Sequence, residues 1–364
     1  MRAALMTAPG QPLELVEDVE LESPRAGEVK VQLHNCGLCH SDLHFIDGSL
    51  PGPTPLLLGH EAGGIVTDVG AGVLDLAEGD KVILTLRPPC GRCFHCVRGE
   101  MSLCETYAGG LFPDGGTRLS RGGDVVHRSG VNLAAFAEST VVPSAAAVKV
   151  PEDTPLDIAS VIGCAVQTGV GAAINTAKVE PGATVMVVGL GGIGISIVQG
   201  ARIAGAARII GVDTNEARRE QSRHFGVTDT IDPMAGDVPT QVLDLLGRGV
   251  DYAFDAVGAA SLTETCIGSI RNGGQAVMVG VPKITEGVNI HAIAFAMGEK
   301  KLSGCFLGSS NPHREFPRLL DLWRNGKLDL DAMVTGTRPL DEINDAVADM
   351  QAGKGLRTVL SIGS

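Results

Sequence analysis

The first 150 residues alternate polar and apolar positions over short stretches, a pattern that predicts half-buried β-strands. Residues 29–33 read V-K-V-Q-L, so every second side chain is apolar, as in a strand with one face in the core. Residues 63–69, 81–84 and 140–143 predict further short strands, which proline and glycine separate at short intervals. Residues 104–136 lack this periodicity and are rich in glycine, so we predict an ordered loop there.

The pattern changes near residue 180, where continuous apolar runs replace the alternation. Residues 183–188 (A-T-V-M-V-V) and 208–212 (R-I-I-G-V) predict strands that are buried on both faces. Residues 193–204 have helical spacing, and residues 215–225 predict a polar helix. This alternation of strand and helix predicts a parallel, doubly wound sheet. The remaining predicted elements are strands at 251–255, 276–279 and 357–362 and helices at 316–324 and 341–351.

Composition and charge are those of a globular protein with about two domains. The 364 residues are 44% hydrophobic and 20% charged, and the 49 glycines favour tight turns and close backbone packing. The net charge of −13, without a long basic run, disfavours a nucleic acid or an anionic membrane as partner. No apolar stretch is long enough to span a bilayer, and residues 1–9 do not resemble a secretory signal. We therefore predict a cytoplasmic protein.

Four cysteines that are close in sequence, Cys90, Cys93, Cys96 and Cys104, indicate a structural zinc ion. Three thiols spaced three residues apart, with a fourth close behind, suit one tetrahedral Zn²⁺. The alternatives are a chance cluster or a disulfide pair, but intracellular chains seldom store cysteines as disulfides. An ion with four thiolate ligands has no position left for a substrate. We therefore expect this ion to stabilise a lobe of the fold.

A glycine-rich turn follows the first buried strand and predicts a dinucleotide site. Residues 189–194 read G-L-G-G-I-G and open a helix. Gly189 allows the tight turn, Gly191 lets a pyrophosphate approach the backbone, and Gly194 permits close helix–strand packing. Asp213 ends the next strand, where a carboxylate accepts hydrogen bonds from ribose hydroxyls and repels a 2′-phosphate, which favours NAD(H) over NADP(H). Arg218 is either a ribose contact or a solvated charge on the helix.

Three further candidate metal ligands, Cys39, His60 and Cys164, stand far apart in the sequence. Two thiolates and one imidazole form the three-ligand pattern of a catalytic zinc, whose fourth position stays open for water or substrate. Each of these residues alone would more often be a packing residue, because a buried cysteine behaves as a small hydrophobe. Their combination with a nicotinamide site favours the metal. Cys36, Cys266 and Cys305 match no motif, and we expect them in the core.

Taken together, these motifs resemble the zinc-dependent alcohol dehydrogenases of the medium-chain dehydrogenase/reductase superfamily over essentially the whole chain. The matching stretches are G-L-C-H-S-D at 37–42, L-G-H-E at 58–61, the four-cysteine lobe, G-C at 163–164, G-L-G-G-I-G at 189–194, I-I-G-V-D at 209–213, V-G-V-P at 279–282 and R-T-V-L at 357–360. The resemblance implies an α/β fold with a β-rich GroES-like catalytic domain over residues 1–165 and 308–364. It implies a Rossmann dinucleotide-binding domain over residues 166–307.

The resemblance also implies roles for single residues. Cys39, His60 and Cys164 would bind the catalytic zinc, so that with the structural ion each chain would hold two Zn²⁺. Asp42 would orient the imidazole ligand. Ser41 would hydrogen-bond the substrate alcohol, His44 would be the outer base of a proton relay, and Glu61 would lie beside the zinc. The implied contacts to NAD(H) are His40, Thr168, Gly189, Gly191, Gly192, Ile193, Gly194, Asp213, Arg218, Val257, Val281 and Arg357.

The implied reaction is reversible oxidation of an alcohol to an aldehyde or ketone, with hydride transfer to NAD. Leu86 and Leu307 align with positions that wall the substrate pocket, and Gly109 and Val131 lie in the variable loop. This apolar set favours primary alcohols with medium-chain, allylic or aromatic tails as small-molecule substrates.

Three alternatives remain at the level of sequence. A thiol-dependent formaldehyde dehydrogenase would need cations for the thiol's carboxylates, and Arg118, Arg121 and Arg128 are candidates, although solvated loop charges are favoured. A second alternative keeps NAD permanently bound and uses an external electron acceptor. A third is a non-catalytic zinc- and dinucleotide-binding sensor or structural protein. The resemblance further implies a homodimer paired through sheet edges near residues 290–306, or a homotetramer.

Overall fold

The computed structural model describes residues 1–128 and 133–363 and divides the chain into two compact units. Unit 1 comprises Met1–Cys164, Asn311–Arg324 and Leu330–Ser364, and unit 2 comprises Ala165–Ser310 and Asn325–Asp329. The predicted dinucleotide-binding domain, residues 166–307, therefore differs from unit 2 by one residue at its start and three at its end. Unit 2 also includes residues 325–329, which the sequence pattern did not indicate.

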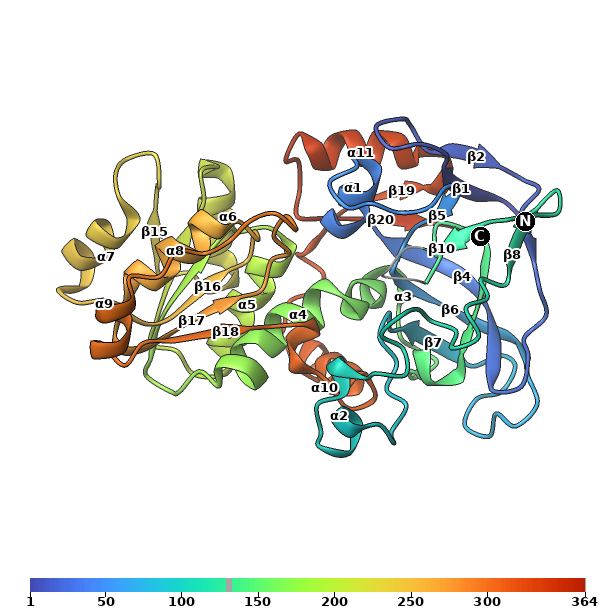
Figure 1. The fold of residues 1–364 in the computed structure, drawn as a ribbon, viewed down its shortest axis with the longest axis horizontal. Coiled ribbons are helices and arrows are strands. Elements are labelled where there is room, and N and C mark those ends of the chain that lie inside the picture. The colour runs from blue at the N-terminus through green and yellow to red at the C-terminus, as the bar shows by residue number, and fades with distance from the viewer. Residues whose placement is uncertain (129–132, 364) are drawn as a thin grey trace. The chain divides into compact units, whose positions relative to one another are not determined.

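Unit 1 is built on a seven-stranded sheet in which six strands follow the order β12-β7-β6-β4-β20-β19, while β11 pairs with β4 (Figure 1). These strands are β4 (Glu28–Gly37), β6 (Glu61–Val69), β7 (Lys81–Leu84), β11 (Ser139–Pro143), β12 (Ala147–Lys149), β19 (Val334–Pro339) and β20 (Arg357–Ser361). The alternation in β4 buries Val29, Val31 and Leu33, as predicted. Antiparallel pairing of β4 with β6 sets Gly37 opposite Glu61. This register brings the segment after β4 next to the start of β6.

The remaining elements of unit 1 are short. A four-stranded sheet has the order β10-β5-β1-β2, with β1 (Ala3–Met6), β2 (Glu14–Val16), β5 (Leu56–Leu57) and β10 (His127–Arg128). A three-stranded sheet has the order β3-β8-β9, with β3 (Glu20–Leu21), β8 (Leu119–Arg121) and β9 (Asp124–Val125). The helices are α1 (His40–Ile46), α2 (Phe94–Val97), α3 (Leu156–Ala159), α10 (Pro312–Arg324) and α11 (Ile343–Gln351). The predicted loop at 104–136 thus contains three short strands, β8, β9 and β10. They escaped the sequence pattern because two- and three-residue strands show no periodicity.

Unit 2 holds a six-stranded sheet with the order β15-β14-β13-β16-β17-β18, and every neighbouring pair is parallel (Figure 1). The strands are β13 (Thr184–Val188), β14 (Arg208–Val212), β15 (Asp229–Ile231), β16 (Val250–Asp255), β17 (Ile270–Met278) and β18 (Lys301–Gly304). The helices are α4 (Ala165–Gly171), α5 (Gly192–Ile203), α6 (Glu216–Phe225), α7 (Val238–Leu246), α8 (Ala260–Ser269) and α9 (Ala292–Met297). Counted from β13, the strand order is 3-2-1-4-5-6, the doubly wound arrangement that the sequence predicted.

The core of unit 2 explains why its strands lack alternation. All five residues of β13 are buried, because α5 packs on β13 and β14 while α8 packs on β13, β16 and β17. Met186, Ile210 and Cys266 belong to one apolar cluster between these elements. The order of the strands reverses at β13, and the crevice beside the carboxyl end of such a strand is where doubly wound sheets bind ligands. The turn that follows β13 is therefore placed for a ligand.

Among the described residues, no single helix is long and apolar enough to cross a membrane, and one bent pair, Leu156–Gly163 with Ala165–Ala177, passes by length and composition.

Candidate active site and metal centres

Cys39, His60 and Cys164 meet in unit 1, although about a hundred residues separate the second from the third in sequence. Cys39 precedes α1, His60 precedes β6, and Cys164 follows a 3₁₀ turn, Ser160–Gly163. Their ligand atoms, together with a carboxylate oxygen of Glu61, all lie within 4.8 Å of one another, and all four residues are buried. The pairing of β4 with β6 sets Gly37 opposite Glu61 and so brings the segments of Cys39 and His60 together, and the turn Ser160–Gly163 before Cys164 packs on both strands.

The imidazole of His60 is oriented as a metal ligand requires. Its Nδ1 lies 3.0 Å from Oδ1 of Asp42, and both side chains are fully buried. Asp42 is itself fixed, because it accepts the backbone N–H groups of Cys39 at 3.2 Å and Gly59 at 3.1 Å. The other ring nitrogen, Nε2, is buried and has no hydrogen-bond partner in the described part of the chain. A buried polar atom without a partner is costly, and a cation between the thiols would satisfy it.

The two thiols of this cluster are hydrogen-bonded to each other. A hydrogen bond from Cys164 lowers the pKa of Cys39, and the same bond, with burial, raises the pKa of Cys164. Burial opposes protonation of His60, yet Asp42 and Cys39 raise its pKa. The site therefore brings two thiols and one imidazole together in a fully buried position. This donor set fits Zn²⁺, which binds thiolate sulfur and imidazole nitrogen.

The Glu61 carboxylate, the fourth group of this cluster, is paired with Arg357. The two side chains form a buried ion pair, with exposed fractions of 0% and 3%. Burial raises the pKa of Glu61 to about 7, and the charge of Arg357 opposes that rise. A Cβ at position 37 would collide with the Glu61 carboxylate, so Gly37 leaves room for the pair. The sequence analysis did not predict this role of Gly37, although Gly37 is the first residue of the G-L-C-H-S-D stretch.

The predicted proton-relay residues lie three residues apart on α1. The Ser41 hydroxyl oxygen is 3.9 Å from the Cys39 sulfur, which places it at the edge of the metal cluster. His44 is half-buried, and its Nδ1 has no hydrogen-bond partner among the described residues. His40, the first residue of α1, is exposed. One short helix therefore carries a hydroxyl beside the cluster and an imidazole one turn further on.

The cysteine quartet forms a second cluster in unit 1. The sulfur atoms of Cys90, Cys93, Cys96 and Cys104 all lie within 4.8 Å of one another. Cys90 and Cys96 are 4.0 Å apart, and Cys93 and Cys104 are 3.9 Å apart. A tetrahedral ion with Zn–S bonds of ~2.3 Å requires sulfur–sulfur separations of ~3.8 Å. The quartet therefore already has nearly the dimensions of a four-thiolate zinc site.

The turn after β13 is shaped for a phosphate group. Gly189 has φ +87°, and a Cβ there would collide with Val257. A Cβ on Gly194 would collide with the carbonyl oxygen of Gly189, so the helix can start close to the strand only with glycine here. Gly191 is different, because no atom lies within 4 Å of its missing Cβ. That open space at the N-terminus of the twelve-residue helix α5 fits the backbone approach of a pyrophosphate.

Asp213 fixes the same turn from the end of β14. Its Oδ2 accepts the N–H of Leu190 at 2.8 Å, and its Oδ1 accepts the N–H of Asn215 at 2.8 Å. Arg218 lies on α6, and its neighbour Arg219 donates to the Asp213 carbonyl at 2.6 Å. Nothing in the local sequence distinguishes these adjacent arginines.

The remaining predicted cofactor residues are divided between the two units. In unit 2, Val257 and Val281 are each 51% exposed, whereas Thr168 is buried and its Oγ1 has no partner within the described ranges. The side chain of Ile193 is half-buried in the first turn of α5, beside Gly192. Arg357 and His40 belong to unit 1.

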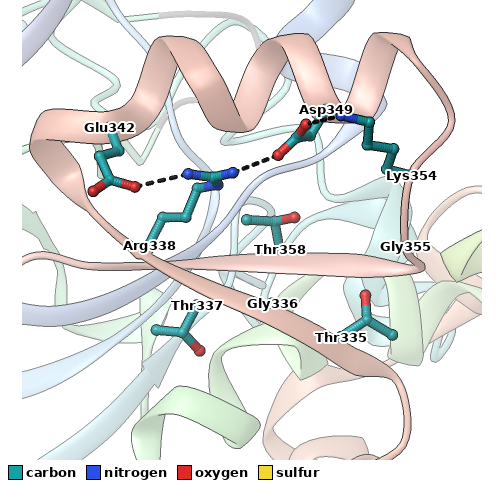
Figure 2. Close-up of a pocket in the computed structure, with 9 residues that line it drawn as sticks. All are labelled: Thr335, Gly336, Thr337, Arg338, Glu342, Asp349, Lys354, Gly355 and Thr358. Atoms are coloured by element: carbon teal, nitrogen blue, oxygen red, sulfur yellow. Dashed lines mark hydrogen bonds and ion pairs between the residues drawn. The ribbon is translucent and has the colours of Figure 1, made fainter.

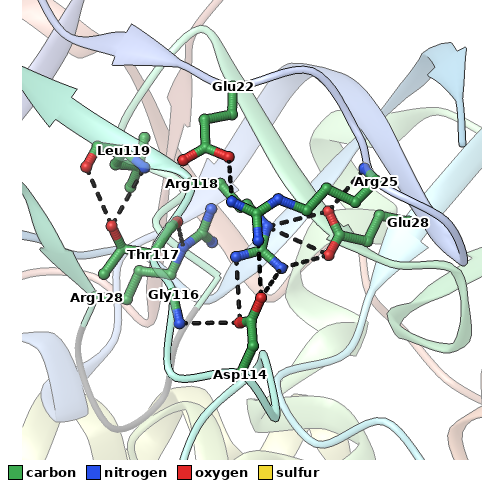
Figure 3. Close-up of polar contacts among 9 residues, drawn as sticks. All are labelled: Glu22, Arg25, Glu28, Asp114, Gly116, Thr117, Arg118, Leu119 and Arg128. Carbon is green, nitrogen blue, oxygen red and sulfur yellow. Dashed lines mark hydrogen bonds and ion pairs between the residues drawn. The ribbon is translucent and has the colours of Figure 1, made fainter.

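Two of the three loop arginines, Arg118 and Arg128, are bound within unit 1 by several partners, which corrects the interpretation of these two as solvated charges (Figure 3). Arg118 is 3% exposed and contacts Glu28 at 2.6 Å and Asp114 at 2.8 Å. Arg128 donates to the carbonyl oxygens of Thr117, Leu133 and Val141.

Burial next to Arg118 lowers the pKa of Arg128 to about 9. Arg121 pairs with Asp18 at 2.8 Å and Glu14 at 3.4 Å. Arg118 and Arg128 therefore hold the segment in place, whereas Arg121 forms surface pairs.

The substrate-wall candidates are mostly apolar and covered. Leu86 is 6% exposed and Leu307 is 7% exposed, whereas Gly109 is exposed and Val131 lies outside the described residues. A separate surface cavity of about 320 Å³ is lined by β19, α11 and the turn before β20 (Figure 2). Its charged residues are paired internally, since Arg338 contacts Glu342 and Asp349, and Lys354 also contacts Asp349. It contains none of the predicted site residues.

Comparison with known proteins places the chain in a family. Residues 25–152 match the model of the alcohol dehydrogenase GroES-like domain, and residues 192–325 match the model named zinc-binding dehydrogenase. The chain is 38% identical to the S-(hydroxymethyl)glutathione dehydrogenase of Paracoccus denitrificans, across 99% of both chains. It is 36% identical to the class-P alcohol dehydrogenase of Arabidopsis thaliana, across 100% of this chain and 97% of that one.

Two crystal structures share the fold over the whole chain. One is an alcohol dehydrogenase zinc-binding domain protein from Burkholderia ambifaria, with a TM-score of 0.94, 34% identity and coverage of 100% of this chain and 99% of that one. The other is the benzyl alcohol dehydrogenase of Acinetobacter calcoaceticus, with a TM-score of 0.94, 30% identity and the same coverage. The chain therefore belongs to the zinc-dependent medium-chain alcohol dehydrogenases. It is an oxidoreductase with a small-molecule substrate, and the predicted fold class is confirmed.

Proposed function

We propose that this enzyme is an NAD-dependent dehydrogenase of primary alcohols with medium-chain, allylic or aromatic tails. The observation that carries the proposal is the buried cluster of Cys39, His60 and Cys164. Glu61 is paired with Arg357, and we propose that the two thiols and the imidazole are the three protein ligands, which leaves one position for a substrate hydroxyl. A structural zinc site would have all four positions filled by protein, as in the cysteine quartet.

The residues around this cluster have separable tasks. Zinc, when bound, acts as a Lewis acid that lowers the pKa of a substrate hydroxyl toward neutrality. Asp42 holds the His60 ring so that Nε2 faces the thiols. Ser41 is placed to accept the hydroxyl proton at its Oγ, and His44, with an unpartnered Nδ1, is placed to pass it toward solvent. Nicotinamide supplies the hydride chemistry in this class of reaction.

The preference for NAD(H) over NADP(H) rests on Asp213. Its carboxylate is anchored by the backbone N–H groups of Leu190 and Asn215, so it cannot easily turn away from a phosphate placed at the end of β14. A 2′-phosphate would meet this negative charge, whereas a ribose hydroxyl would donate to it. The proposal predicts a higher kcat/KM with NAD⁺ than with NADP⁺. Dialysis followed by assay with and without added NAD⁺ separates an exchangeable cofactor from a permanently bound one.

The substrate class follows from the apolar residues Leu86 and Leu307 and from the similarity to a protein named benzyl alcohol dehydrogenase. The second candidate is a thiol-dependent formaldehyde dehydrogenase, which the names of several relatives favour. Against it, Arg118 and Arg128 are engaged inside unit 1 and are not available for a thiol's carboxylates, and Arg121 is paired with Asp18.

One experiment separates these functions. NADH formation is measured with ethanol, hexanol, benzyl alcohol and formaldehyde, each with and without glutathione, on protein assayed for zinc. We expect about two zinc ions per chain and higher kcat/KM for hexanol and benzyl alcohol, independent of glutathione. Formaldehyde oxidation that requires glutathione would replace the first candidate by the second. Zinc without turnover of any alcohol would support the non-catalytic alternative.

We also propose that the chain forms a homodimer through unit 2, with a tetramer as a further possibility. β18 is the last strand of its sheet, and the preceding helix α9 has no buried residue. Ile293 and Met297 on α9 are 68% and 80% exposed, which is unusual for large apolar side chains. A second copy paired with β18 would cover both features. A monomer in light scattering would contradict this proposal, and the variant Ile293→Asp should dissociate a dimer.

The cytoplasm remains the proposed compartment. All nine cysteines lie in the described residues, none is in a disulfide, and six of them belong to the two metal clusters. Thiols that serve as zinc ligands suit a reducing environment. Fractionation of cells that express the protein would test this assignment.

A further inference from the structure

Asp255 is a buried residue at the carboxyl end of β16, and no sequence motif marked it. Its Oδ1 accepts the backbone N–H groups of Val257 at 3.0 Å and Gly258 at 2.9 Å. Its Oδ2 accepts the Thr263 hydroxyl, on α8, at 2.8 Å. Hydrogen bonds to a carboxylate are stronger than bonds between neutral groups, and a buried network of this kind is rigid. Asp255 therefore fixes the turn that follows β16 to the start of α8.

The backbone around Asp255 joins the same turn to both neighbouring strands. The carbonyl oxygen of Asp255 accepts the N–H groups of Val279 at 3.0 Å and Gly280 at 2.9 Å, in the turn after β17. On the other side, the N–H of Ala256 donates to the carbonyl oxygen of Val188, the last residue of β13, at 3.0 Å. These bonds connect the carboxyl ends of three adjacent strands, β13, β16 and β17.

The turns after these strands are packed too closely to move independently. A Cβ on Gly258, which has φ +90°, would collide with the backbone of Gly280 and Val281. A Cβ on Gly189, in the glycine-rich turn, would collide with Cγ2 of Val257. The side chains of Val257 and Val281 are nevertheless each 51% exposed. A shift of the Val257–Gly258 turn would therefore displace its neighbours and change the apolar surface that the two valines present.

The position of the Val257–Gly258 turn relates it to one half of a dinucleotide. The strand order of the sheet reverses at β13, and a dinucleotide binds across the crevice at such a point. The glycine-rich turn after β13 suits the pyrophosphate, and Asp213 at the end of β14 suits the adenosine ribose. Since β14 and β16 flank β13 on opposite sides, the β16 side is left for the nicotinamide half. The turn that Asp255 holds lies on that side.

We propose that Asp255 is a positioning residue, which holds the Val257–Gly258 turn in the conformation that receives the nicotinamide half of the cofactor. The inference rests on the proposed function, because it assumes that a nicotinamide dinucleotide is bound. Asp255 need not touch the cofactor for this role. Its carboxylate keeps the two turn N–H groups in place before the cofactor binds, so that binding does not have to order the turn.

Two probes and two variants test this role on the full chain. NADH covers both sides of the crevice, whereas ADP carries the adenosine and the pyrophosphate but lacks the nicotinamide and its ribose. We expect Asp255→Ala to raise the Kd of NADH by about tenfold, because binding must then order the turn, and to change the Kd of ADP by less than about twofold. Thr263→Val keeps the side-chain shape and removes one hydrogen bond, so it should raise the Kd of NADH by about threefold. Titration calorimetry measures both probes.

Asp251→Ala is the matched control, because Asp251 is an aspartate near the other end of the same strand. Its Oδ2 accepts the N–H of Thr184 at 2.8 Å, and its Oδ1 accepts a bond from Arg271 at 2.6 Å. This variant weakens the sheet at the amino ends of β13 and β16, far along the strands from the turns. It should change neither Kd by more than about twofold. In Asp255→Asn the amide oxygen can still accept from the turn, so this variant should recover most of the affinity for NADH.

Hydrogen exchange of the protein without cofactor gives a readout that is independent of binding. The amides of Val257 and Gly258 should exchange faster in Asp255→Ala than in the wild type, because they lose their acceptor. Asp251→Ala should leave the exchange of these two amides unaltered.

The outcomes separate the positioning role from the proposed function. Equal losses of affinity for NADH and ADP would show a general loss of structure and would overturn the positioning role alone. An unaltered Kd of NADH in Thr263→Val and Asp255→Ala would do the same, and Thr263→Val decides by itself if Asp255→Ala does not fold. A wild type that binds neither NADH nor NADPH would overturn the proposed function, and the inference with it.

Discussion

The buried arginine in the 104–136 segment allows a quantitative test of how that segment is held. Arg118 is 3% exposed, and its guanidinium contacts Glu28, whose side chain is 9% exposed, and Asp114 (Figure 3). It also stacks on the Phe112 ring, with Cζ 4.1 Å from the ring centroid. Arg118→Met removes the positive charge but keeps much of the volume. The Glu28 carboxylate would then remain buried without its main partner.

The expected loss of stability follows from this burial. Removing one partner of a buried ion pair typically costs about 3–5 kcal/mol, because the other charge stays desolvated. We therefore expect Arg118→Met to lower the free energy of unfolding of unit 1 by about 4 kcal/mol. Arg121→Met is the matched control. Arg121 is 34% exposed and pairs with exposed carboxylates, and such surface pairs contribute less than about 1 kcal/mol.

Urea unfolding followed by tryptophan fluorescence measures both variants. The chain has one tryptophan, Trp323, which lies on α10 in unit 1, so its emission reports on that unit. The double variant Glu28→Met with Arg118→Met should lose less stability than Arg118→Met alone, because an apolar pair can replace a buried ion pair with little loss. Equal losses for Arg118→Met and Arg121→Met, or no recovery in the double variant, would refute the reasoning.

Three other predictions concern the metals, the cofactor and pH. Cys96→Ser should release one zinc ion and lower stability, whereas Cys164→Ser should release the other and abolish turnover in a folded chain, as metal analysis and circular dichroism would show. Asp213→Gly should raise kcat/KM with NADP⁺ relative to NAD⁺ by at least about tenfold, and an unchanged ratio would contradict its role. The hydrogen bond from Arg208 lowers the pKa of Asp229, so this carboxylate stabilises the fold above its ordinary pKa of about 4 and loses that effect as pH falls through the lower folded value. Arg208→Met should therefore reduce the difference in melting temperature between pH 7 and pH 3, and an unaltered difference would exclude this pair as a source of the acid sensitivity.

The sequence located the Rossmann-like part well because its signals are local. Continuous apolar runs marked β13 and β14, and the G-L-G-G-I-G turn between β13 and α5 lies where the pattern placed it. The same local reasoning failed for β8, β9 and β10, which are too short to show a period. It also failed for Arg118 and Arg128. Their partners Glu28 and Val141 are distant or unremarkable in sequence, so nothing near the arginines indicated that they are buried.

The sequence by itself determined the chemistry that this protein can perform: two thiol-rich sets suited to zinc, a glycine turn suited to a pyrophosphate and a carboxylate suited to a ribose. The cysteine quartet and the glycine turn depend only on residue type and short spacing, whereas Cys39, His60 and Cys164 stand far apart and were favoured only by their combination with the nicotinamide site. Only the tertiary structure decided which side chains contact one another, which are paired with partners inside the protein and which buried polar atoms have no hydrogen-bond partner. The pairing of β4 with β6 brings Cys39 close to His60, and Arg357 forms an ion pair with Glu61. The π-helix Ala172–Ala177 hydrogen-bonds the left-handed turn at residues 307–309. Burial and hydrogen bonding depend on contacts between segments far apart in the chain, and local sequence carries little information about them.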